Sequence, residues 1–325
     1  MATYYAATSG ETSKREKEHM QLVRELAGEC MTLLENDGTL PLKNAGKIAL
    51  FGNGARHTVK GGTGSGDVNT RSVATIEEGM EAAGFEITTK SWLEKYDQSY
   101  TAAQKEYWDE VGKIATEKKL PEIVVTFSFA FAEPAAPFVT EEDVKASDTD
   151  TAVYVIARNS GEGSDRFNRR GDYLLSEHEV ANIRFLAEHY EKTIVILNVA
   201  NVIDMKEIRE AKVNTVLLAG QAGNIGGYAV ADVLLGKTLP SGKLTDTWAV
   251  NYSDYPSSEN FSHNNGNVDD EYYNDGIYVG YRYFETFKKD VALLPHFMPV
   301  QYYGGENQNY KPKRKADSFH YPLVL

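Results

Sequence analysis

The amino-acid sequence predicts an α/β fold: a three-layer α/β/α sandwich of flavodoxin-like type, with a mostly parallel sheet of about six strands. Apolar, β-branched runs alternate along the chain with segments of helical periodicity, which is the order typical of βαβ units. The apolar runs are continuous rather than alternating, and this favours strands that are covered by helices on both faces. At 325 residues the chain is long enough to bury the core that such a sandwich needs.

Each predicted element rests on a local pattern. In the first helix apolar residues recur every three or four positions from Met20 to Leu34, and the Asp37-Gly38 turn ends it. Ser176 and Glu179 have the spacing of a capping box, which predicts a helix start. The predicted helices cover residues 15–36, 75–83, 96–119, 176–189 and 226–235, and the predicted strands cover residues 47–51, 85–91, 122–127, 151–157, 193–197 and 215–218.

The sandwich is expected over residues 40–250, after an N-terminal helical segment at residues 1–39. Residues 251–290 hold eight acidic against three basic residues and many tyrosines, and we predict an ordered loop because those rings need a surface to pack on. Such rings either stack on sugars or fill a seam between domains, and we favour the seam. Residues 291–325 show neither helical nor strand periodicity, so we expect an atypical, poorly ordered tail.

Composition excludes several classes of partner. The chain carries 47 acidic against 34 basic residues, a net charge of −13, which argues against nucleic acid and anionic membranes. No apolar run approaches the roughly 20 residues of a membrane span, and no export signal is visible, so a cytoplasmic protein is expected. Cys30, the single cysteine, is predicted to be a buried structural thiol on the apolar face of the first helix. The isolated histidines predict no metal site, and no cofactor is expected.

One acidic loop stands out as a candidate site. The segment from Asn159 to Arg166, Asn-Ser-Gly-Glu-Gly-Ser-Asp-Arg, follows the apolar run 151–157 directly. It is therefore expected at the carboxyl end of a strand, where open α/β sheets bind their ligands. Glu162 stands between two glycines, which leave room for a ligand beside its carboxylate. The alternative is an ordinary solvated acid, because most carboxylates are exposed.

A glycine-rich loop over residues 61–69, Gly-Gly-Thr-Gly-Ser-Gly-Asp-Val-Asn, follows the first predicted strand of the sandwich. It lacks the Lys-Ser/Thr pair of a P-loop, and His57 stands where the third glycine of a dinucleotide fingerprint belongs. Nucleotide binding is therefore disfavoured. Asp67 and Asn69 are candidates to hydrogen-bond a ligand, and a purely structural turn is an equal alternative.

Five segments, in order and at similar spacing, resemble glycoside hydrolase family 3, the β-glucosidases and their relatives. They cover residues 26–42, 61–69, 161–166, 220–244 and 274–284. The resemblance implies the C-terminal-type sandwich domain of that family, with Glu162 as general acid/base and the glycine-rich loop lining the sugar pocket. Asp165 and Arg166 are then expected to brace the loop as an ion pair, because the arginine fork fits a carboxylate.

The resemblance leaves half of an active site missing. Retaining hydrolysis needs a second carboxyl about 5–5.5 Å from the acid/base, which acts as the nucleophile. In the family this aspartate lies on a (β/α)8 barrel in a Ser-Asp-Trp-like motif, and none of the three tryptophans here is preceded by such a motif. A barrel takes about 250 residues, for which the chain has no room. The resemblance therefore implies a barrel partner in cis or in trans, and it fits members with inverted domain order, in which the sandwich precedes the barrel.

The leading functional hypothesis is hydrolysis of terminal, non-reducing β-D-glucosyl residues with retention, in which this chain supplies the acid/base domain. A β-glucoside or a small oligosaccharide is the expected substrate, and activity of the chain alone is left open. The second hypothesis is a non-catalytic carbohydrate-binding or interaction module that has lost its barrel. The third is an unrelated flavodoxin-like nucleotide binder. A homodimer is also considered, because the face that a barrel would cover otherwise exposes apolar surface.

Overall fold

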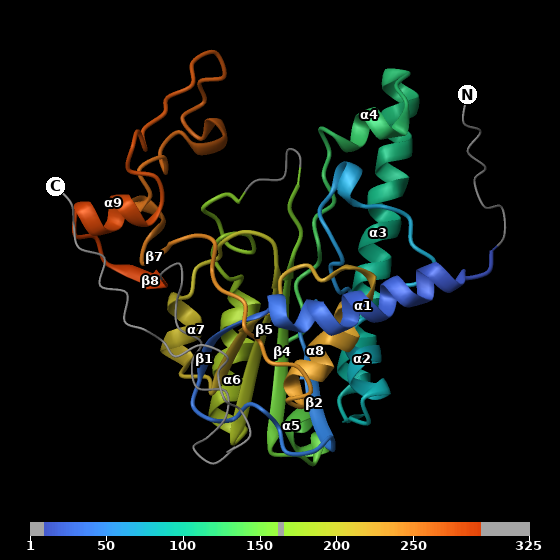
Figure 1. Ribbon diagram of the computed structural model, residues 1–325. Coiled ribbons are helices and arrows are strands. Elements are labelled where there is room, and N and C mark those ends of the chain that lie inside the picture. The colour runs from blue at the N-terminus through green and yellow to red at the C-terminus, as the bar shows by residue number, and fades with distance from the viewer. Residues whose placement is uncertain (1–9, 162–165, 294–325) are drawn as a thin grey trace.

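A six-stranded sheet forms the centre of the computed structural model, which describes residues 10–161 and 166–293 (Figure 1). Across the sheet the strands lie in the order β1-β6-β5-β4-β2-β3. The strand β1 runs antiparallel to β6, and the other neighbouring strands are parallel. The strands are β1 Thr32–Asn36, β2 Lys47–Phe51, β3 Glu86–Ile87, β4 Thr151–Arg158, β5 Lys192–Val199 and β6 Thr215–Leu218.

The five parallel strands have the flavodoxin-like order. When β2 to β6 are counted along the chain, their lateral order is second, first, third, fourth, fifth. The direction of the chain across the sheet reverses here, so β2 and β4 flank the topological switch point at which ligands of such sheets bind. The predicted fold class is confirmed.

Helices cover both faces of the sheet, as its continuous apolar strands require. All of β4 is buried up to Ala157, and β5 is buried from Thr193 onward. On one face α8 packs with both α2 and α1, and on the other α6 packs with α7 (Figure 1). The helices are α1 Lys14–Cys30, α2 Ile76–Ala82, α3 Lys90–Lys118, α4 Glu122–Thr126, α5 Glu141–Ser147, α6 Glu177–His189, α7 Lys206–Ala211, α8 Gly226–Leu234 and α9 Tyr281–Thr286.

The helices α2 and α8 approach so closely that only glycine fits between them. A Cβ on Gly227 would lie 1.8 Å from the carbonyl oxygen of Thr75, which caps α2. A Cβ on Gly79 would lie 2.0 Å from the carbonyl oxygen of Gly227. The two helices therefore pack backbone against backbone, and this contact sets the position of α2 on the sheet.

The first predicted helix ends earlier than its apolar pattern suggests. The helix α1 ends at Cys30, Met31 is extended, and residues 32–36 pair with β6, so the prediction of a helix as far as residue 36 is wrong. The residues from Met31 to Leu34 are all buried, which a helix with one apolar face does not allow. Cys30 is exposed, so the prediction of a buried thiol is also wrong. The division of the chain at residues 39, 250 and 290 stays a prediction.

The β-branched run at residues 122–127 forms the helix α4, so the prediction of a strand there is wrong. Pro121 precedes this helix with φ −61°, a value that suits a helix start. Val125 packs on Val111 of α3, whereas Ile123 is 64% exposed. The run therefore covers the end of α3 instead of joining the sheet.

Residues 251–290 form short helical turns and α9, beside a two-stranded sheet of β7 (Trp248–Ala249) and β8 (Val291–Leu293). Phe284 is buried, and Tyr278 packs on Phe287 with ring centroids 5.2 Å apart, but Tyr272 and Tyr273 are exposed, so the prediction that these rings pack is wrong for those two. Residues 294–325 of the predicted tail lie outside the described residues. Among the described helices none is long and apolar enough to cross a membrane.

Candidate active site

Four loops meet at the carboxyl edge of the sheet, and two buried asparagines join them. Asn53, after β2, accepts a hydrogen bond from the Ala157 N–H (2.8 Å) and donates to the Ala157 carbonyl (3.1 Å). Asn198, in β5, accepts from the Val59 N–H (2.6 Å) and donates to the carbonyls of Val59 (2.9 Å) and Gly220 (2.7 Å). Because both side chains are buried and satisfied, they fix the loops after β2 and β6 relative to β4 and β5.

The glycine-rich loop lies against the start of the predicted catalytic loop. The Thr63 N–H donates to the Ser160 carbonyl (3.1 Å). A Cβ on Gly161 would lie 2.4 Å from the Thr63 hydroxyl oxygen, and a Cβ on Gly62 would lie 2.9 Å from the Ser160 carbonyl oxygen. Glycine at both positions therefore permits the contact. The sequence predicts the two loops separately, and the structure brings them together at the switch point.

Arg166 stands at the other end of the predicted catalytic loop, where its side chain is 10% exposed. Its guanidinium donates to the Asp172 carboxylate (2.8 Å) and to the carbonyls of Asn159 (2.7 Å) and Ala200 (3.3 Å). Asp172 also accepts from the Phe167 N–H (3.1 Å). These contacts fix the chain where it returns from the loop, and Asp172 is a partner that the sequence pattern did not reveal.

The remaining predicted site residues differ in their surroundings. Glu162 and Asp165 lie outside the described residues. Asp67 is exposed, and its carboxylate pairs with Lys60 at 2.6 Å. Asn69 is exposed and lines a cleft near the start of α1. Among the described residues, no group of three or more His, Cys, Asp or Glu side chains is placed to hold a metal ion.

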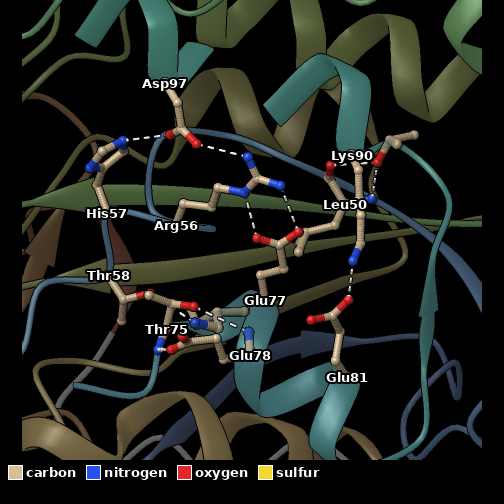
Figure 2. Close-up of polar contacts among 12 residues, drawn as sticks. Leu50, Arg56, His57, Thr58, Thr75, Glu77, Glu78, Glu81, Lys90 and Asp97 are labelled. Carbon is tan, nitrogen blue, oxygen red and sulfur yellow. Dashed lines mark hydrogen bonds and ion pairs between the residues drawn. The ribbon is translucent and has the colours of Figure 1, made fainter. Parts of the chain in front are cut away.

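An ion-pair cluster that the sequence analysis missed holds the chain between β2 and the glycine-rich loop (Figure 2). Arg56 bonds the Glu77 carboxylate through two nitrogens (2.5 and 3.0 Å) and the Asp97 carboxylate through a third (2.7 Å). The hydrogen bonds to Glu77 raise the pKa of Arg56 despite its partial burial. His57 Nε2 lies 2.9 Å from Asp97, and its ring stacks on Tyr100 with centroids 3.9 Å apart. The cluster ties this segment to both α2 and α3.

A second buried ion pair supports the end of β4. Arg158 donates to Glu179 at 2.5 Å, and the two side chains are 10% and 8% exposed. Burial lowers the pKa of Arg158, but the charge of Glu179 outweighs it, so the pKa is raised. Glu179 also accepts from the Ser176 N–H (2.8 Å), which confirms the predicted capping box of α6. The pair thereby joins the end of β4 to the start of α6.

The carboxyl edge therefore holds a short loop between two fixed points at the switch point of the sheet. Open α/β sheets bind their ligands above the strand ends at such a switch point.

Residues 31–281 match the model of the glycosyl hydrolase family 3 C-terminal domain. The chain belongs to this family. The matched range contains all six strands of the large sheet, the glycine-rich loop and the predicted catalytic loop. The resemblance found in the five sequence segments is confirmed.

Relatives of this family 3 domain are longer proteins. Beta-glucosidase A from Butyrivibrio fibrisolvens is 35% identical over 285 residues, which are 86% of this chain and 34% of the relative. The beta-glucosidase from Ruminococcus albus is 34% identical over 289 residues, 88% of this chain and 28% of the relative. The structure of beta-glucosidase 3B from Thermotoga neapolitana in complex with alpha-D-glucose matches with a TM-score of 0.70 and 34% identity, covering 87% of this chain and 38% of that chain. The family 3 chain thus spans about a third of the length of these curated relatives.

Proposed function

We propose that this family 3 sandwich supplies the acid/base half of a retaining β-glucosidase active site, with Glu162 as the general acid/base. The position of its loop carries the proposal: Gly161 follows β4 at the topological switch point, and the glycine-rich loop packs against it. Relatives that are 34–35% identical over most of the chain are beta-glucosidases, which supports the substrate class.

The proposed reaction has two steps. Glu162 first donates a proton to the glycosidic oxygen while a nucleophilic carboxylate attacks the anomeric carbon, so the aglycone leaves as an alcohol. Glu162 then takes a proton from water, which attacks the same carbon and releases glucose with its β configuration retained. The nucleophile would come from a (β/α)8 barrel in cis or in trans, its carboxyl about 5–5.5 Å from that of Glu162.

The proposal requires that Glu162 holds a proton near neutral pH and releases it within each cycle. A free guanidinium close by would lower the pKa of Glu162 and oppose this. Arg166 already faces the Asp172 carboxylate at 2.8 Å, so its charge is compensated within the loop.

The other assignments belong to the same proposal. Asp165 and Arg166 brace the loop. Of the two candidates for contacts with substrate hydroxyls, Asn69 is preferred over Asp67, because Asp67 already pairs with Lys60. A cytoplasmic location fits a chain with one cysteine. A homodimer is proposed through the face that a barrel would otherwise cover.

A chimera tests the assignment of Glu162. This chain replaces the matched third of the Butyrivibrio fibrisolvens relative, and turnover of p-nitrophenyl β-D-glucoside is measured. We expect the chimera to be active and the Glu162→Gln variant to lose at least about 10²-fold in kcat, the typical contribution of a general acid. Glu188→Gln, at an exposed glutamate on α6, is the matched control and should be unchanged. Equal activity of the two variants would contradict the assignment.

Two further measurements separate chemistry from folding. Thermal melting of the Glu162→Gln and Glu188→Gln chimeras should give equal midpoints. The deficit of Glu162→Gln in kcat/KM, which reports the first step, should shrink for 2,4-dinitrophenyl β-D-glucoside, because this leaving group needs little protonation. A deficit that is the same for both substrates would exclude a role as acid. Binding of glucose by an intact but inactive chimera would favour the non-catalytic carbohydrate-binding module.

A further inference from the structure

The dipeptide Asn-Gly occurs twice in the chain, and the structure holds its two copies in opposite environments. An asparagine side chain is attacked most readily by the backbone when glycine follows, because glycine has no Cβ to shield its nitrogen. Asn53 and Gly54 are buried directly after β2. Asn265 and Gly266 are both exposed, in the segment between β7 and α9 that extends away from the large sheet in Figure 1.

The side chain of Asn53 is held on every side. Its amide nitrogen donates to the Glu133 carboxylate (2.9 Å) and to the Ala157 carbonyl (3.1 Å), and its oxygen accepts from the Ala157 N–H (2.8 Å). The nitrogen of Gly54 is itself occupied, because its N–H donates to the Val155 carbonyl (3.3 Å). The Cγ atom of Asn53 can turn towards that nitrogen only if these bonds break, so Asn53 is an unreactive reference within the same chain.

The side chain of Asn265 is held at one atom. Its oxygen accepts from the Asn267 N–H (3.0 Å), a bond that draws electrons away from Cγ and favours attack there. Gly266 has a φ of +75°, which glycine adopts without strain. The Gly266 N–H donates to the His263 carbonyl (2.8 Å), but this bond lies in an exposed turn, where local opening costs little free energy. The other asparagines of residues 251–290 are each followed by a residue with a side chain.

We propose that Asn265 is a site of spontaneous covalent modification in the folded protein. The Gly266 nitrogen forms a bond to Asn265 Cγ and gives up its proton to water. The bond between Cγ and Nδ2 breaks, and the departing nitrogen takes up a proton and leaves as ammonia. Water then opens the resulting five-membered imide at either of its two carbonyls, which yields aspartate or isoaspartate at position 265.

The modification changes both charge and backbone. Residues 259–275 hold five acidic residues and no lysine or arginine, so the new carboxylate adds charge of the same sign. Isoaspartate also routes the main chain through the former side chain and lengthens it by one methylene, so the Gly266 N–H cannot keep its bond to the His263 carbonyl. Phe261, which precedes this turn, lines a cleft that Arg166 also lines. A loosened turn therefore alters one wall of a cleft beside the candidate active site.

Peptide mass spectrometry of the full chain, incubated at mildly alkaline pH with and without urea, tests the site. Trypsin releases residues 48–56 with Asn53 and residues 244–282 with Asn265, so both positions are measured in one sample. In the folded chain we expect Asn265 to convert at least about tenfold faster than Asn53, which reacts only when the structure around it opens. In urea the two should convert at similar rates, because glycine follows both.

Two variants locate the reaction. Asn265→Gln should abolish conversion within residues 244–282, because glutamine would have to close a larger ring, whereas the matched control Asn264→Gln should leave it unchanged. Both side chains are exposed, so both variants should fold. Isoaspartate is identified by its methylation with a protein isoaspartyl methyltransferase, and amide hydrogen exchange over residues 261–270 should be faster in the converted chain.

Three results would overturn the inference. The first is conversion of Asn265 in the folded chain that is no faster than that of Asn53. The second is conversion in residues 244–282 that persists in the Asn265→Gln variant, which would place the reaction at another asparagine. The third is hydrogen exchange over residues 261–270 that is the same in the converted and the fresh chain, which would refute the loosening of the turn.

Discussion

The Asp172→Asn substitution tests whether the buried ion pair with Arg166 anchors the loop that carries Glu162. Asparagine keeps the size of the side chain and a carbonyl oxygen for the Phe167 N–H, so mainly the charge is lost. Both side chains of the pair are 10% exposed, and removing one partner of a buried pair costs about 3–5 kcal/mol. Arg166 keeps its bonds to two carbonyls, which favours the lower limit of about 3 kcal/mol.

Urea unfolding followed by circular dichroism measures this loss. The midpoint should fall with little change in the m value, because the surface exposed on unfolding stays the same. A loss of about 3 kcal/mol would lower Tm by roughly 6–12 °C. Glu210→Gln is the control, because its ion pair with Arg184 leaves both side chains 48% exposed. We expect a loss of about 1 kcal/mol or less there.

The double variant Arg166→Met with Asp172→Asn completes the test. Replacing the arginine removes the unpaired buried charge, so the double variant should regain much of the stability lost by Asp172→Asn. If Asp172→Asn costs no more than the Glu210 control, or if the double variant regains nothing, the ion pair does not anchor the loop.

Three further substitutions or reactions test other parts of the structure. Gly227→Ala should lower the free energy of unfolding by about 1–3 kcal/mol or more, because the new Cβ would lie 1.8 Å from the Thr75 carbonyl oxygen. Gly226→Ala is the control, because its Cβ would lie 3.4 Å from its nearest neighbour. Urea unfolding of both variants measures the difference, and equal stability would contradict the close contact. Burial raises the pKa of Asp204, so its charged carboxylate disfavours the folded state. Asp204→Asn should therefore raise Tm at pH 7, and the difference in Tm from the parent chain should shrink as the pH falls through that raised pKa. A difference in Tm that does not shrink at low pH would contradict the raised pKa. Cys30 is exposed, so the folded chain should react with a thiol reagent as completely as the urea-unfolded chain; protection in the folded state would contradict the structure.

The parts of the fold that the sequence predicted are those with strong local patterns. The apolar runs that became β4 and β5 are buried on both faces, which only the centre of a sheet provides. The loop from Asn159 followed its strand directly, so its place at the carboxyl edge could be predicted. The fold class and the place of the candidate loop could therefore be predicted from local patterns and from the order of the strands along the chain.

The missed features depend on contacts between distant residues. Leu33 and Leu34 continue the helical spacing of α1, and only the pairing of β1 with β6 makes them a strand. Val125 lies in a β-branched run that is typical of a strand. In the structure it packs on α3, which precedes it in the chain, and not in the sheet. The hydrogen bonds that fix the site loops join distant residues, such as Asn53 and Ala157, which are 104 residues apart. No local sequence pattern reveals such a partner. The clusters around Arg56 and Asp172 escaped prediction for the same reason.

Chemical rescue tests the proposed role of Glu162 most directly. The chimera with Glu162→Gly should hydrolyse 2,4-dinitrophenyl β-D-glucoside slowly, because no general base activates water in the second step. Sodium azide needs no base, so it should accelerate turnover and yield β-glucosyl azide, identified by NMR from its retained configuration. A folded variant whose rate is unaffected by azide, or a product with α configuration, would contradict the assignment of Glu162 as the acid/base of a retaining enzyme.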